Sequence, residues 1–268
     1  MIDIVMCTLG KRTTLPVALR CLENQRIVNK IFVVSPHDLD IINSYRNTEL
    51  VKEDDVSCLA WARKKGISYC RSKYLAFVDD DVLLHKEHLS KLHKKLIEWR
   101  KKYARPVVEG VLTTLSIQKM DYPRIPYKSK ILKRGERGFT HNTLFLRETI
   151  SDWNPPFIHV YEDLHLTQFI HSKGGIWLRY LQDVPSFHFS DHSEYSRKRW
   201  VFANVREQRL MGHKKVFNDM FRNLIYGLRL TLANNDVRFL VQKFKGTRGT
   251  MHGFYNWGQF VKLVSRKD

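Results

Sequence analysis

The 268-residue sequence has only four cysteines, all within its first 70 residues, and they form neither a CxxC pair nor a metal-ligand spacing with histidine. We therefore expect reduced thiols and neither a disulfide framework nor a zinc site. No window approaches 18 consecutive apolar residues, so no membrane-spanning helix is expected. The first residues, MIDIVMCTLGK, have too short an apolar run for a signal-peptide core, so we expect a cytoplasmic protein that is not secreted.

Glycine-rich phosphate-binding motifs are also missing. The first apolar run is not followed by GxGxxG, and neither GxxxxGKS nor GxxxxGKT occurs, so a Rossmann dinucleotide site and a P-loop lack their defining glycines. GxSxG is absent as well, which argues against an α/β-hydrolase. Hydrophobic residues make up 43% of the chain, a proportion typical of a globular protein.

Acidic residues are scarce relative to basic ones, with 27 Asp and Glu against 46 Lys and Arg and a net charge of +19. Such an excess favours an anionic partner, which can be nucleic acid, anionic lipid headgroups or nucleotide phosphates. Two segments carry most of the excess: residues 86–105 have a net charge of +6, and residues 191–268 have +10.

The first 190 residues alternate short apolar runs with segments of helical periodicity. The predicted strands are 2–7, 31–35, 74–78, 106–115, 139–147, 176–181 and 184–189, and the predicted helices are 13–24, 57–69, 86–102 and 163–172. Apolar runs without strict alternation are typical of strands covered on both faces, so we predict an α/β fold with a mostly parallel central sheet. Residues 119–138 have no clear period and are predicted to form a long loop.

From about residue 194 the pattern indicates helices only. Large apolar residues recur at intervals of three or four: Phe217, Met220, Phe221, Leu224, Leu228 and Leu232. Basic residues decorate the same segment, and basic and aromatic residues continue through Lys243 to Lys262. We predict one domain over residues 1–190 and a basic amphipathic helical extension over residues 191–268.

Three consecutive carboxylates, Asp79, Asp80 and Asp81, directly follow the predicted strand 74–78. Open α/β sheets bind ligands at the carboxyl ends of their strands. Like charges this close repel one another, and a hard cation such as Mg²⁺ or Mn²⁺ that carries phosphates would relieve the repulsion. The alternative is a solvated acidic turn that caps the next helix.

Two other positions carry possible chemistry. Glu162 and Asp163 lie at the start of the predicted helix 163–172. Acids at this position are either stabilised by the helix dipole or provide a general base for an attacking hydroxyl. His188 lies in the aromatic run PSFHF. It is either a core histidine with a satisfied hydrogen bond or a further ligand for a metal on the aspartate cluster. Both pairs of alternatives stay open.

Together these elements resemble an inverting glycosyltransferase of the GT-A fold, most similar to family 2, over about residues 2–190. The first strand ending at Thr8 is similar to the family's first nucleotide-binding strand, and LAWARKKGI (59–67) resembles the helix whose AR..G segment precedes the metal strand. FVDDD (77–81) matches the DxD motif, and YED (161–163) matches the ED motif. The order of these motifs and their spacing make the combination fairly specific.

The resemblance implies a nucleotide-binding half over residues 1–115 and an acceptor half over residues 116–190. It implies that Asp79 faces the ribose or the metal shell, that Asp81 binds the metal, and that Asp163 deprotonates the acceptor. With the residue-level candidates added, the predicted site comprises Asp163 and Glu162 as catalytic residues, Thr8, Arg12, Arg63, Asp79 and Asp80 as donor-binding residues, and Asp81, Asp79 and His188 as metal ligands. Mn²⁺ or Mg²⁺ is the expected cofactor.

One departure from the family affects the donor. Where the family often has an acidic residue after the second strand to read the base, this chain has Ser35-Pro36-His37-Asp38. A UDP-sugar is therefore our first choice and a GDP-sugar our second, with Asp38 as the nearest acid that could substitute.

The basic, aromatic extension suits the plane of an anionic membrane surface. We hypothesise a peripheral enzyme on the cytosolic face of a membrane, with a hydroxyl or phosphate acceptor such as a lipid-linked glycan. The alternative for the extension is that its apolar stripe packs on the catalytic domain. Two other functions stay open: a metal-dependent nucleic-acid-binding enzyme, disfavoured because no known nucleic-acid-binding motif occurs, and an inactive GT-A homologue at a membrane surface.

Overall fold

The computed structural model describes residues 1–53, 58–116, 129–156, 162–184, 186–190 and 212–255. They belong to two compact units. The first consists of Met1–Leu115, Pro126–Phe157 and Glu162–Phe189, and the second includes Ser190–Asp268. Half of the long loop predicted at 119–138 (residues 119–128), and the extension before residue 212 and after residue 255, lie outside the described residues.

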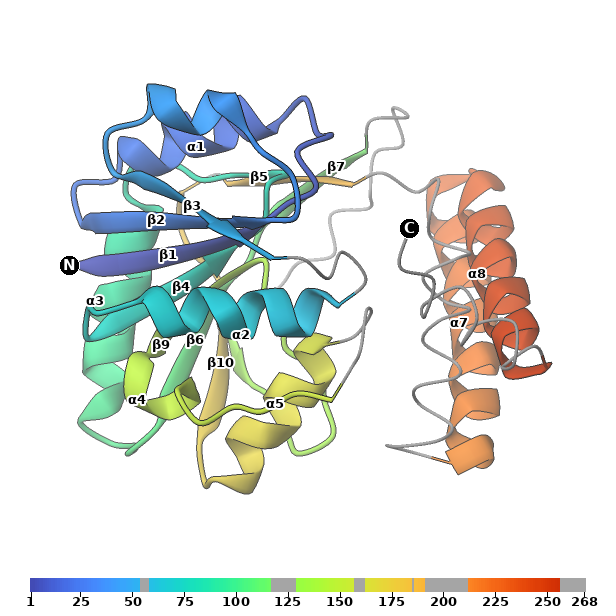
Figure 1. Cartoon of the computed structure of the whole chain (residues 1–268). Helices are drawn as coiled ribbons and strands as arrows, with labels where there is room; N and C mark the ends of the chain where they lie inside the picture. The colour runs from blue at the N-terminus through green and yellow to red at the C-terminus, as the bar shows by residue number, and fades with distance from the viewer. Residues whose placement is uncertain (54–57, 117–128, 157–161, 185, 191–211, 256–268) are drawn as a thin grey trace. The chain divides into compact units, whose positions relative to one another are not determined.

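The first unit is built on an eight-stranded sheet with the order β3-β2-β1-β4-β9-β6-β10-β8 (Figure 1). Its strands are β1 (Ile2–Cys7), β2 (Val28–Ser35), β3 (Thr48–Lys52), β4 (Tyr74–Val78), β6 (Pro106–Gly110), β8 (Lys130–Ile131), β9 (Asn142–Leu146) and β10 (Ile176–Tyr180). Strands β3, β2, β1 and β4 are parallel, and so are β6 and β10, whereas β9 is antiparallel to both of its neighbours. The predicted α/β fold with a mostly parallel sheet is confirmed.

Helices cover both faces of this sheet. Helices α1 (Leu15–Glu23) and α3 (His88–Arg100) share one core with Ile4 of β1, while α2 (Leu59–Tyr69) packs on the opposite face of β1 and β2. Gly66 allows the close approach of α2, because a Cβ at this position would lie 2.4 Å from a methyl group of Val5. The remaining helical segments of the unit are η1 (Asp40–Ser44), α4 (Arg147–Ile150) and α5 (Glu162–Ser172).

The strand register determines where the site forms. Val5 of β1 pairs with Phe77 of β4, so the residues that follow both strands leave the sheet side by side. A second sheet, with the order β5-β11-β7, consists of β5 (Val82–Leu83), β11 (Phe187–Ser190) and β7 (Thr113–Ser116). Because His188 pairs with Val82, this small sheet connects the end of the first unit to the segment after β4.

The strand predicted at 106–115 was wrong in one respect. The chain leaves the main sheet after Gly110 and enters the small sheet at Thr113, so the single predicted strand is two strands. Three short strands, β3, β5 and β8, were not predicted; β8 lies within the stretch 119–138 that was expected to be a loop.

The described residues of the second unit form two helices, α7 (Gly212–Asn234) and α8 (Arg238–Tyr255), which pack against each other as a hairpin. Asn235 has the left-handed backbone that reverses the chain (φ 49°), and Leu230 and Phe239 form a buried apolar pair. None of the helices that the structure describes combines the length and apolar character needed to cross a bilayer.

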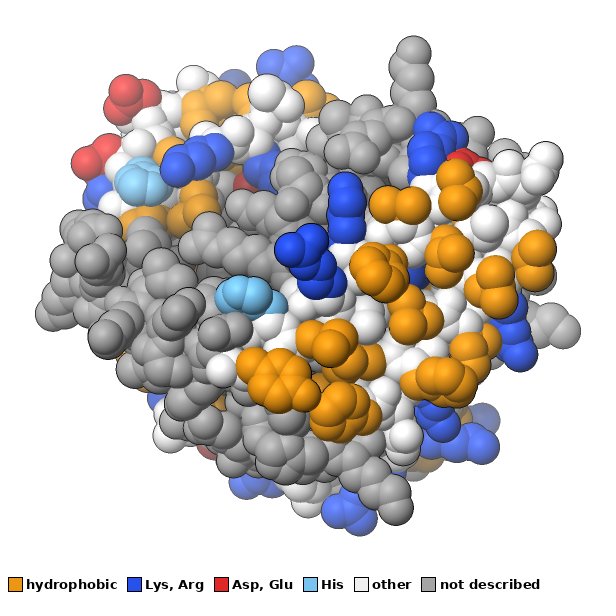
Figure 2. All heavy atoms as spheres, turned by 90° about the vertical axis from the view of Figure 1, so that its right-hand side faces the viewer, with side chains coloured by type: hydrophobic (Ala, Val, Ile, Leu, Met, Phe, Trp, Pro, Cys, Tyr) orange, Lys and Arg blue, Asp and Glu red, His pale blue; other side chains and the backbone are white. Residues whose placement is uncertain are grey.

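The apolar residues of this hairpin largely face outward. On α7 the exposed apolar side chains recur every three or four residues: Phe217, Phe221, Ile225, Leu228 and Leu232. On α8 they are Val241, Phe244, Met251 and Tyr255, and Val237 directly precedes the helix. The buried side of α8 carries polar residues, among them Gln242, Thr247 and Thr250. Figure 2 shows the face that carries α7 and α8, where apolar side chains are gathered with lysine and arginine among and beside them.

Candidate active site

Asp79, Asp80 and Asp81 follow the last residue of β4, as predicted, and their side chains have different partners. Asp80 accepts a hydrogen bond from the Thr8 hydroxyl, and its backbone carbonyl accepts one from Thr14 Oγ1 at 2.9 Å. The Arg12 guanidinium lies 3.9 Å from an Asp80 oxygen and 3.4 Å from an Asp81 oxygen. Thr8, Arg12, Asp80 and Asp81 therefore form one cluster, which we call the β4 cluster.

His188, which is near the last residue of the first unit in the sequence, contacts the β4 cluster. Its Nε2 lies 3.4 Å from Asp81 Oδ1, and the backbone N–H of Phe189 donates to the Asp81 carbonyl at 2.8 Å. Within the described part of the chain, Asp81 Oδ1 is buried and accepts no hydrogen bond. A buried carboxylate oxygen without a donor is costly in the absence of a cation.

The electrostatics of the β4 cluster disfavour its negative charge. Burial raises the pKa of Asp80 to about 6, and although the Thr8 hydrogen bond and Arg12 lower it, the neighbouring Asp81 and Asp79 raise it further. Among the described residues, no group of three His, Cys, Asp or Glu side chains is arranged to hold a metal on its own.

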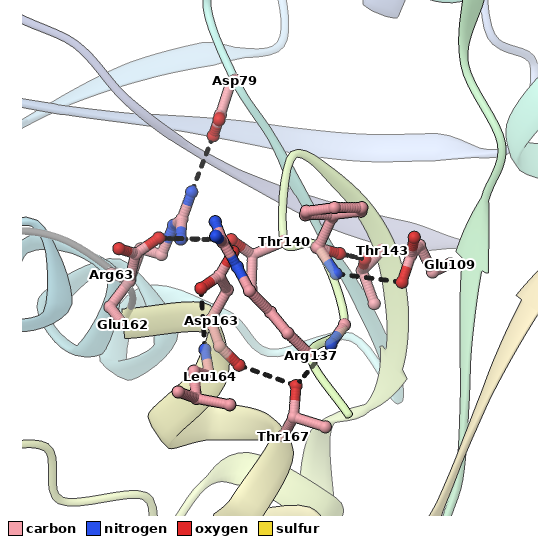
Figure 3. Close-up of polar contacts among 12 residues, drawn as sticks. Arg63, Asp79, Glu109, Arg137, Thr140, Thr143, Glu162, Asp163, Leu164 and Thr167 are labelled. Carbon is pink, nitrogen blue, oxygen red and sulfur yellow. Dashed lines mark hydrogen bonds and ion pairs between the residues drawn. The ribbon is translucent and has the colours of Figure 1, made fainter. Parts of the chain in front are cut away.

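Asp79 points to a different partner, the buried Arg63 of α2 (Figure 3). Arg63 Nη2 donates to Asp79 Oδ1 at 2.7 Å, and its Nη1 contacts both Glu162 and Thr140. Burial opposes the charge of the guanidinium, but Glu162 and Asp79 outweigh this effect and raise the pKa of Arg63. Burial likewise opposes ionisation of Asp79, and Arg63 outweighs it, so the pKa of Asp79 is lowered. Arg63 thus connects α2, β4 and the start of α5 through its ion pairs with Asp79 and Glu162.

Asp163 lies beside Glu162 in the first turn of α5, with a side chain that is only 6% exposed. Its Oδ1 accepts a hydrogen bond from the backbone N–H of Leu164 at 2.7 Å. Its Oδ2 accepts one from Arg137 Nε at 2.8 Å and forms an ion pair with Arg137 Nη2 at 2.6 Å (Figure 3). Burial raises the pKa of Asp163 to about 6; Arg137 lowers it, and Glu162 raises it again. A carboxylate with this pKa is mostly ionised at neutral pH and yet basic enough to accept a proton.

Three stacked rings lie between the two groups of acids. The rings of Phe139 and His141 have centroids 5.3 Å apart, and those of His141 and His188 are 5.0 Å apart and nearly parallel. Burial lowers the pKa of His141 to about 3, so its ring is neutral near pH 7. The Arg137 guanidinium lies 5.2 Å from the centre of the Phe139 ring, at the other end of this stack.

The first unit brings the predicted residues together in two sets. Thr8, Arg12, Asp80, Asp81 and His188 form one set, and Arg63, Asp79 and Glu162 form the other, with Asp163 next to Glu162. Asp38 instead pairs with Lys52 at 2.5 Å on the surface. Sequence reasoning missed Arg137, Thr140 and His141. Arg137 belongs to the basic stretch predicted as a loop, and nothing in that stretch signals a contact with residue 163.

Comparison with known proteins identifies a family. The model of the family described as "Glycosyl transferase family 2" matches residues 3–149, which is more than half of the chain. No curated protein sequence gives a match.

Solved structures of TarS from S. aureus resemble the chain in fold. The structure of TarS residues 1–349 in complex with UDP-GlcNAc has a TM-score of 0.56 at 11% identity, and the match covers 97% of this chain and 92% of that one. A UDP complex of the same TarS fragment has a TM-score of 0.54. A longer TarS structure matches with a TM-score of 0.54 at 12% identity over 77% of this chain, which spans only 40% of that one.

The family match includes the segments LAWARKKGI (59–67) and FVDDD (77–81), and the TarS structures resemble the chain in fold. On this basis, the chain belongs to glycosyl transferase family 2, and its first unit has the GT-A fold.

Proposed function

We propose that this protein transfers a sugar from a UDP-sugar to an acceptor hydroxyl with inversion at the anomeric carbon. One observation carries the proposal: a buried carboxylate with a pKa near 6, Asp163, lies in the same unit as a second pair of acids, Asp80 and Asp81, which share Arg12 at 3.9 and 3.4 Å. The first suits a proton acceptor, and the second suits a metal-bound diphosphate. UDP is chosen as the nucleotide because the TarS structures of similar fold hold UDP or UDP-GlcNAc.

The β4 cluster is the proposed donor site. Asp81 and His188 would hold a divalent cation, since they are adjacent and Asp81 Oδ1 is buried without a donor. When bound, Mn²⁺ or Mg²⁺ would supply positive charge for the departing diphosphate. Asp80 and Thr8 fix the turn after β4, and Arg12 offers a guanidinium to the phosphates. Asp79 contributes to the donor side through Arg63, which joins it to the start of α5.

Asp163 is the proposed base. It takes the proton from the acceptor hydroxyl as that oxygen attacks the anomeric carbon. The bond between the anomeric carbon and the β-phosphate oxygen breaks at the same time, and UDP leaves with the bonding electron pair. Glu162 contributes by binding Arg63, which aligns the first turn of α5 with β4.

A thermal-shift screen tests the donor. UDP- and GDP-sugars are added with and without Mn²⁺ to the wild type, to Asp81→Asn and to Asp152→Asn, a surface control whose aspartate pairs with Lys173. We expect a UDP-sugar with Mn²⁺ to raise Tm in the wild type and the control, because ligand binding stabilises the native state. The shift is expected to be lost in Asp81→Asn. No stabilisation of the wild type by any nucleotide would contradict the proposal.

The α7–α8 hairpin is proposed to bind the cytosolic surface of an anionic membrane, where the acceptor is a lipid-linked glycan. The outward apolar residues of both helices support this, because large exposed apolar patches are unusual on isolated surfaces. Lysine and arginine outnumber aspartate and glutamate eight to two within residues 212–255, which matches an anionic lipid surface. The patch and its basic neighbours are visible in Figure 2.

Flotation with vesicles tests the membrane proposal. We expect the protein to float with phosphatidylglycerol vesicles at low salt and not with pure phosphatidylcholine. The double variant Phe221→Ser, Phe244→Ser removes two large exposed side chains of the patch and is expected to reduce flotation. Ile97→Ser, an exposed apolar residue on α3, is the matched control. The proposal fails if the wild type stays in the soluble fraction, or if the control variant loses binding as much as the double variant does.

A further inference from the structure

The base proposed above is blocked in this structure. Both oxygens of Asp163 already accept hydrogen bonds, Oδ1 from the Leu164 backbone and Oδ2 from Arg137 (Figure 3). Arg137 Nε and Nη2 both lie within 2.8 Å of Oδ2, so this oxygen has little capacity left for an acceptor hydroxyl. The Leu164 donor is a backbone N–H of α5 and cannot move away from Asp163, whereas the Arg137 donor belongs to a side chain.

Arg137 is the partner that can move. Its side chain is 36% exposed, while the side chain of Asp163 is 6% exposed. A guanidinium does not lose its proton in a protein, so Arg137 can release Oδ2 only by turning to another acceptor. An anionic group is the best replacement partner, because it offsets the loss of the ion pair with Asp163.

The segment around Arg137 favours such an anion. Lys130, Lys133 and Arg134 precede it with exposed side chains, and Glu136 is the one acid between residues 130 and 137. The neighbouring Arg179 also lies over the Phe139 ring, at 4.6 Å, but Glu109 holds it with an ion pair of 2.6 Å. Arg137, in contrast, is in direct contact with the proposed base itself.

We propose that Arg137 binds a phosphate group of the acceptor and, by doing so, frees Asp163 Oδ2 for the attacking hydroxyl. The inference rests on the proposed function and specifies its acceptor: an alcohol that carries a phosphate monoester or diester close to the reacting hydroxyl. A guanidinium suits this role, since its parallel N–H groups bind two phosphate oxygens at once. The enzyme would then ionise its acceptor only when the phosphate is in place.

Calorimetric titration of inorganic phosphate into the UDP-bound protein is the first test. We expect saturable binding to the wild type and to Lys173→Met, a control that removes a cation paired with a surface aspartate. In Arg137→Met we expect the affinity to fall at least about tenfold, the loss of one charge-assisted contact. UDP binding is measured in the same samples. If UDP itself does not bind, the proposed function fails; if UDP binds but phosphate does not, or binds Arg137→Met equally well, the role of Arg137 is refuted.

A readout at Asp163 separates this role from a structural one. The ¹³Cγ resonance of Asp163, assigned by its loss in Asp163→Asn, is followed against pH in protein labelled at aspartate. The charged neighbours of this carboxyl are Arg137, Glu162 and Arg63. Phosphate should raise the midpoint of this pH titration in the wild type, because Arg137 leaves the carboxylate. Arg137→Met should raise the midpoint in the absence of phosphate. Arg137→Lys should keep part of the response. A midpoint in the wild type that does not move with phosphate would overturn the proposal.

Transfer assays with a UDP-sugar and two acceptors distinguish a soluble phosphate from a lipid headgroup as the source of the phosphate. Glycerol 1-phosphate represents a soluble phosphate, and vesicles of phosphatidylglycerol represent a lipid headgroup with free hydroxyls; glycerol is the uncharged control. Preference for either phosphorylated acceptor over glycerol, lost in Arg137→Met, supports the proposal and identifies the source. Transfer to glycerol at the same rate as to both of them refutes it.

Discussion

The two groups of carboxylates in the first unit differ in how their charge is balanced. Around α5, each acid has a guanidinium in direct contact: Arg63 binds Asp79 and Glu162, and Arg137 binds Asp163. In the β4 cluster, Asp80 and Asp81 share Arg12 at 3.9 and 3.4 Å, beyond hydrogen-bond length. Each group thus has one more carboxylate than guanidinium, but the acids around α5 are in direct contact with their guanidinia, whereas those of the β4 cluster are not.

This difference suggests how each group works. A network that carries its own cations keeps its geometry in the absence of ligand, and Arg63 holds α2, β4 and α5 together in this way. Acids without a guanidinium in direct contact are instead prepared for a cation that arrives with the substrate. The same comparison explains the opposite pKa shifts of two adjacent residues, lowered for Asp79 and raised to about 6 for Asp80.

The largest expected effect comes from removing the base. Asp163→Asn keeps the size of the side chain and should lower the rate of transfer by about 10²- to 10⁴-fold, the range for loss of general base catalysis. Donor binding should stay intact, because the β4 cluster is untouched. Steady-state assays of UDP release with Asp152→Asn as control measure this effect. A variant that retains full activity would remove Asp163 from the mechanism.

The second-largest effect should be a loss of stability when Arg63, the cation that Asp79 and Glu162 share, is removed. Arg63→Met leaves the buried Glu162 and the partly exposed Asp79 without their guanidinium, and removing one partner of a buried ion pair typically costs about 3–5 kcal/mol. Thermal denaturation should show a large drop in Tm, whereas Arg238→Met, which breaks an exposed ion pair with Asp236, should change little. Equal Tm values for the two variants would mean that Arg63 does not stabilise the group.

The pH dependence of transfer should reflect the α5 group. Because Asp163 must be ionised to accept a proton and its pKa in the free enzyme is raised to about 6, kcat/KM, which reports the free enzyme, should rise with pH and reach half its maximum near pH 6. Below that point it should fall about tenfold per pH unit, as expected for a single ionisation. A profile that stays flat down to pH 5 would place the essential base elsewhere.

The smallest effect should come from the β4 cluster, where a substitution should raise the stability of the fold instead of lowering it. The folded-state pKa of Asp80 is raised above its ordinary value of 3.8, so ionised Asp80 destabilises the fold at neutral pH. Asp80→Asn in the presence of a chelator should therefore raise stability, by on the order of 1 kcal/mol or about 2–4 °C in Tm. The gain should disappear as the pH falls below about 4, where both states are protonated. A loss of stability at neutral pH would contradict the uneven charge balance.

Much of the fold follows from local patterns in the sequence. Strands β1 and β4 and helices α1, α2 and α3 were predicted because their apolar residues recur with clear strand or helix periods. Strand β3, with the sequence TELVK, lies at the sheet edge and buries only Val51, so it lacks the apolar run that signalled the others. The break after Gly110 depends on pairing with distant strands, and no local pattern reports such a choice.

The candidate site was only partly predictable for the same reason. The DDD and ED motifs identified the acids, since they lie at the ends of predicted elements. Their partners depend on contacts between distant residues: Arg63 reaches Glu162 across 99 positions and His188 reaches Asp81 across 107. Sequence reasoning assigned Asp79 to the metal or ribose, and only the structure brings out its ion pair with Arg63.

The division of labour between the two groups is tested most directly by calorimetric titration of UDP with Mn²⁺ into the wild type, Asp81→Asn and Asp163→Asn. The β4 cluster is proposed to hold the diphosphate and Asp163 to serve the acceptor. UDP should therefore bind the wild type and Asp163→Asn with similar affinity and bind Asp81→Asn at least about tenfold more weakly. Unchanged binding by Asp81→Asn, or an equal loss in both variants, would contradict this division.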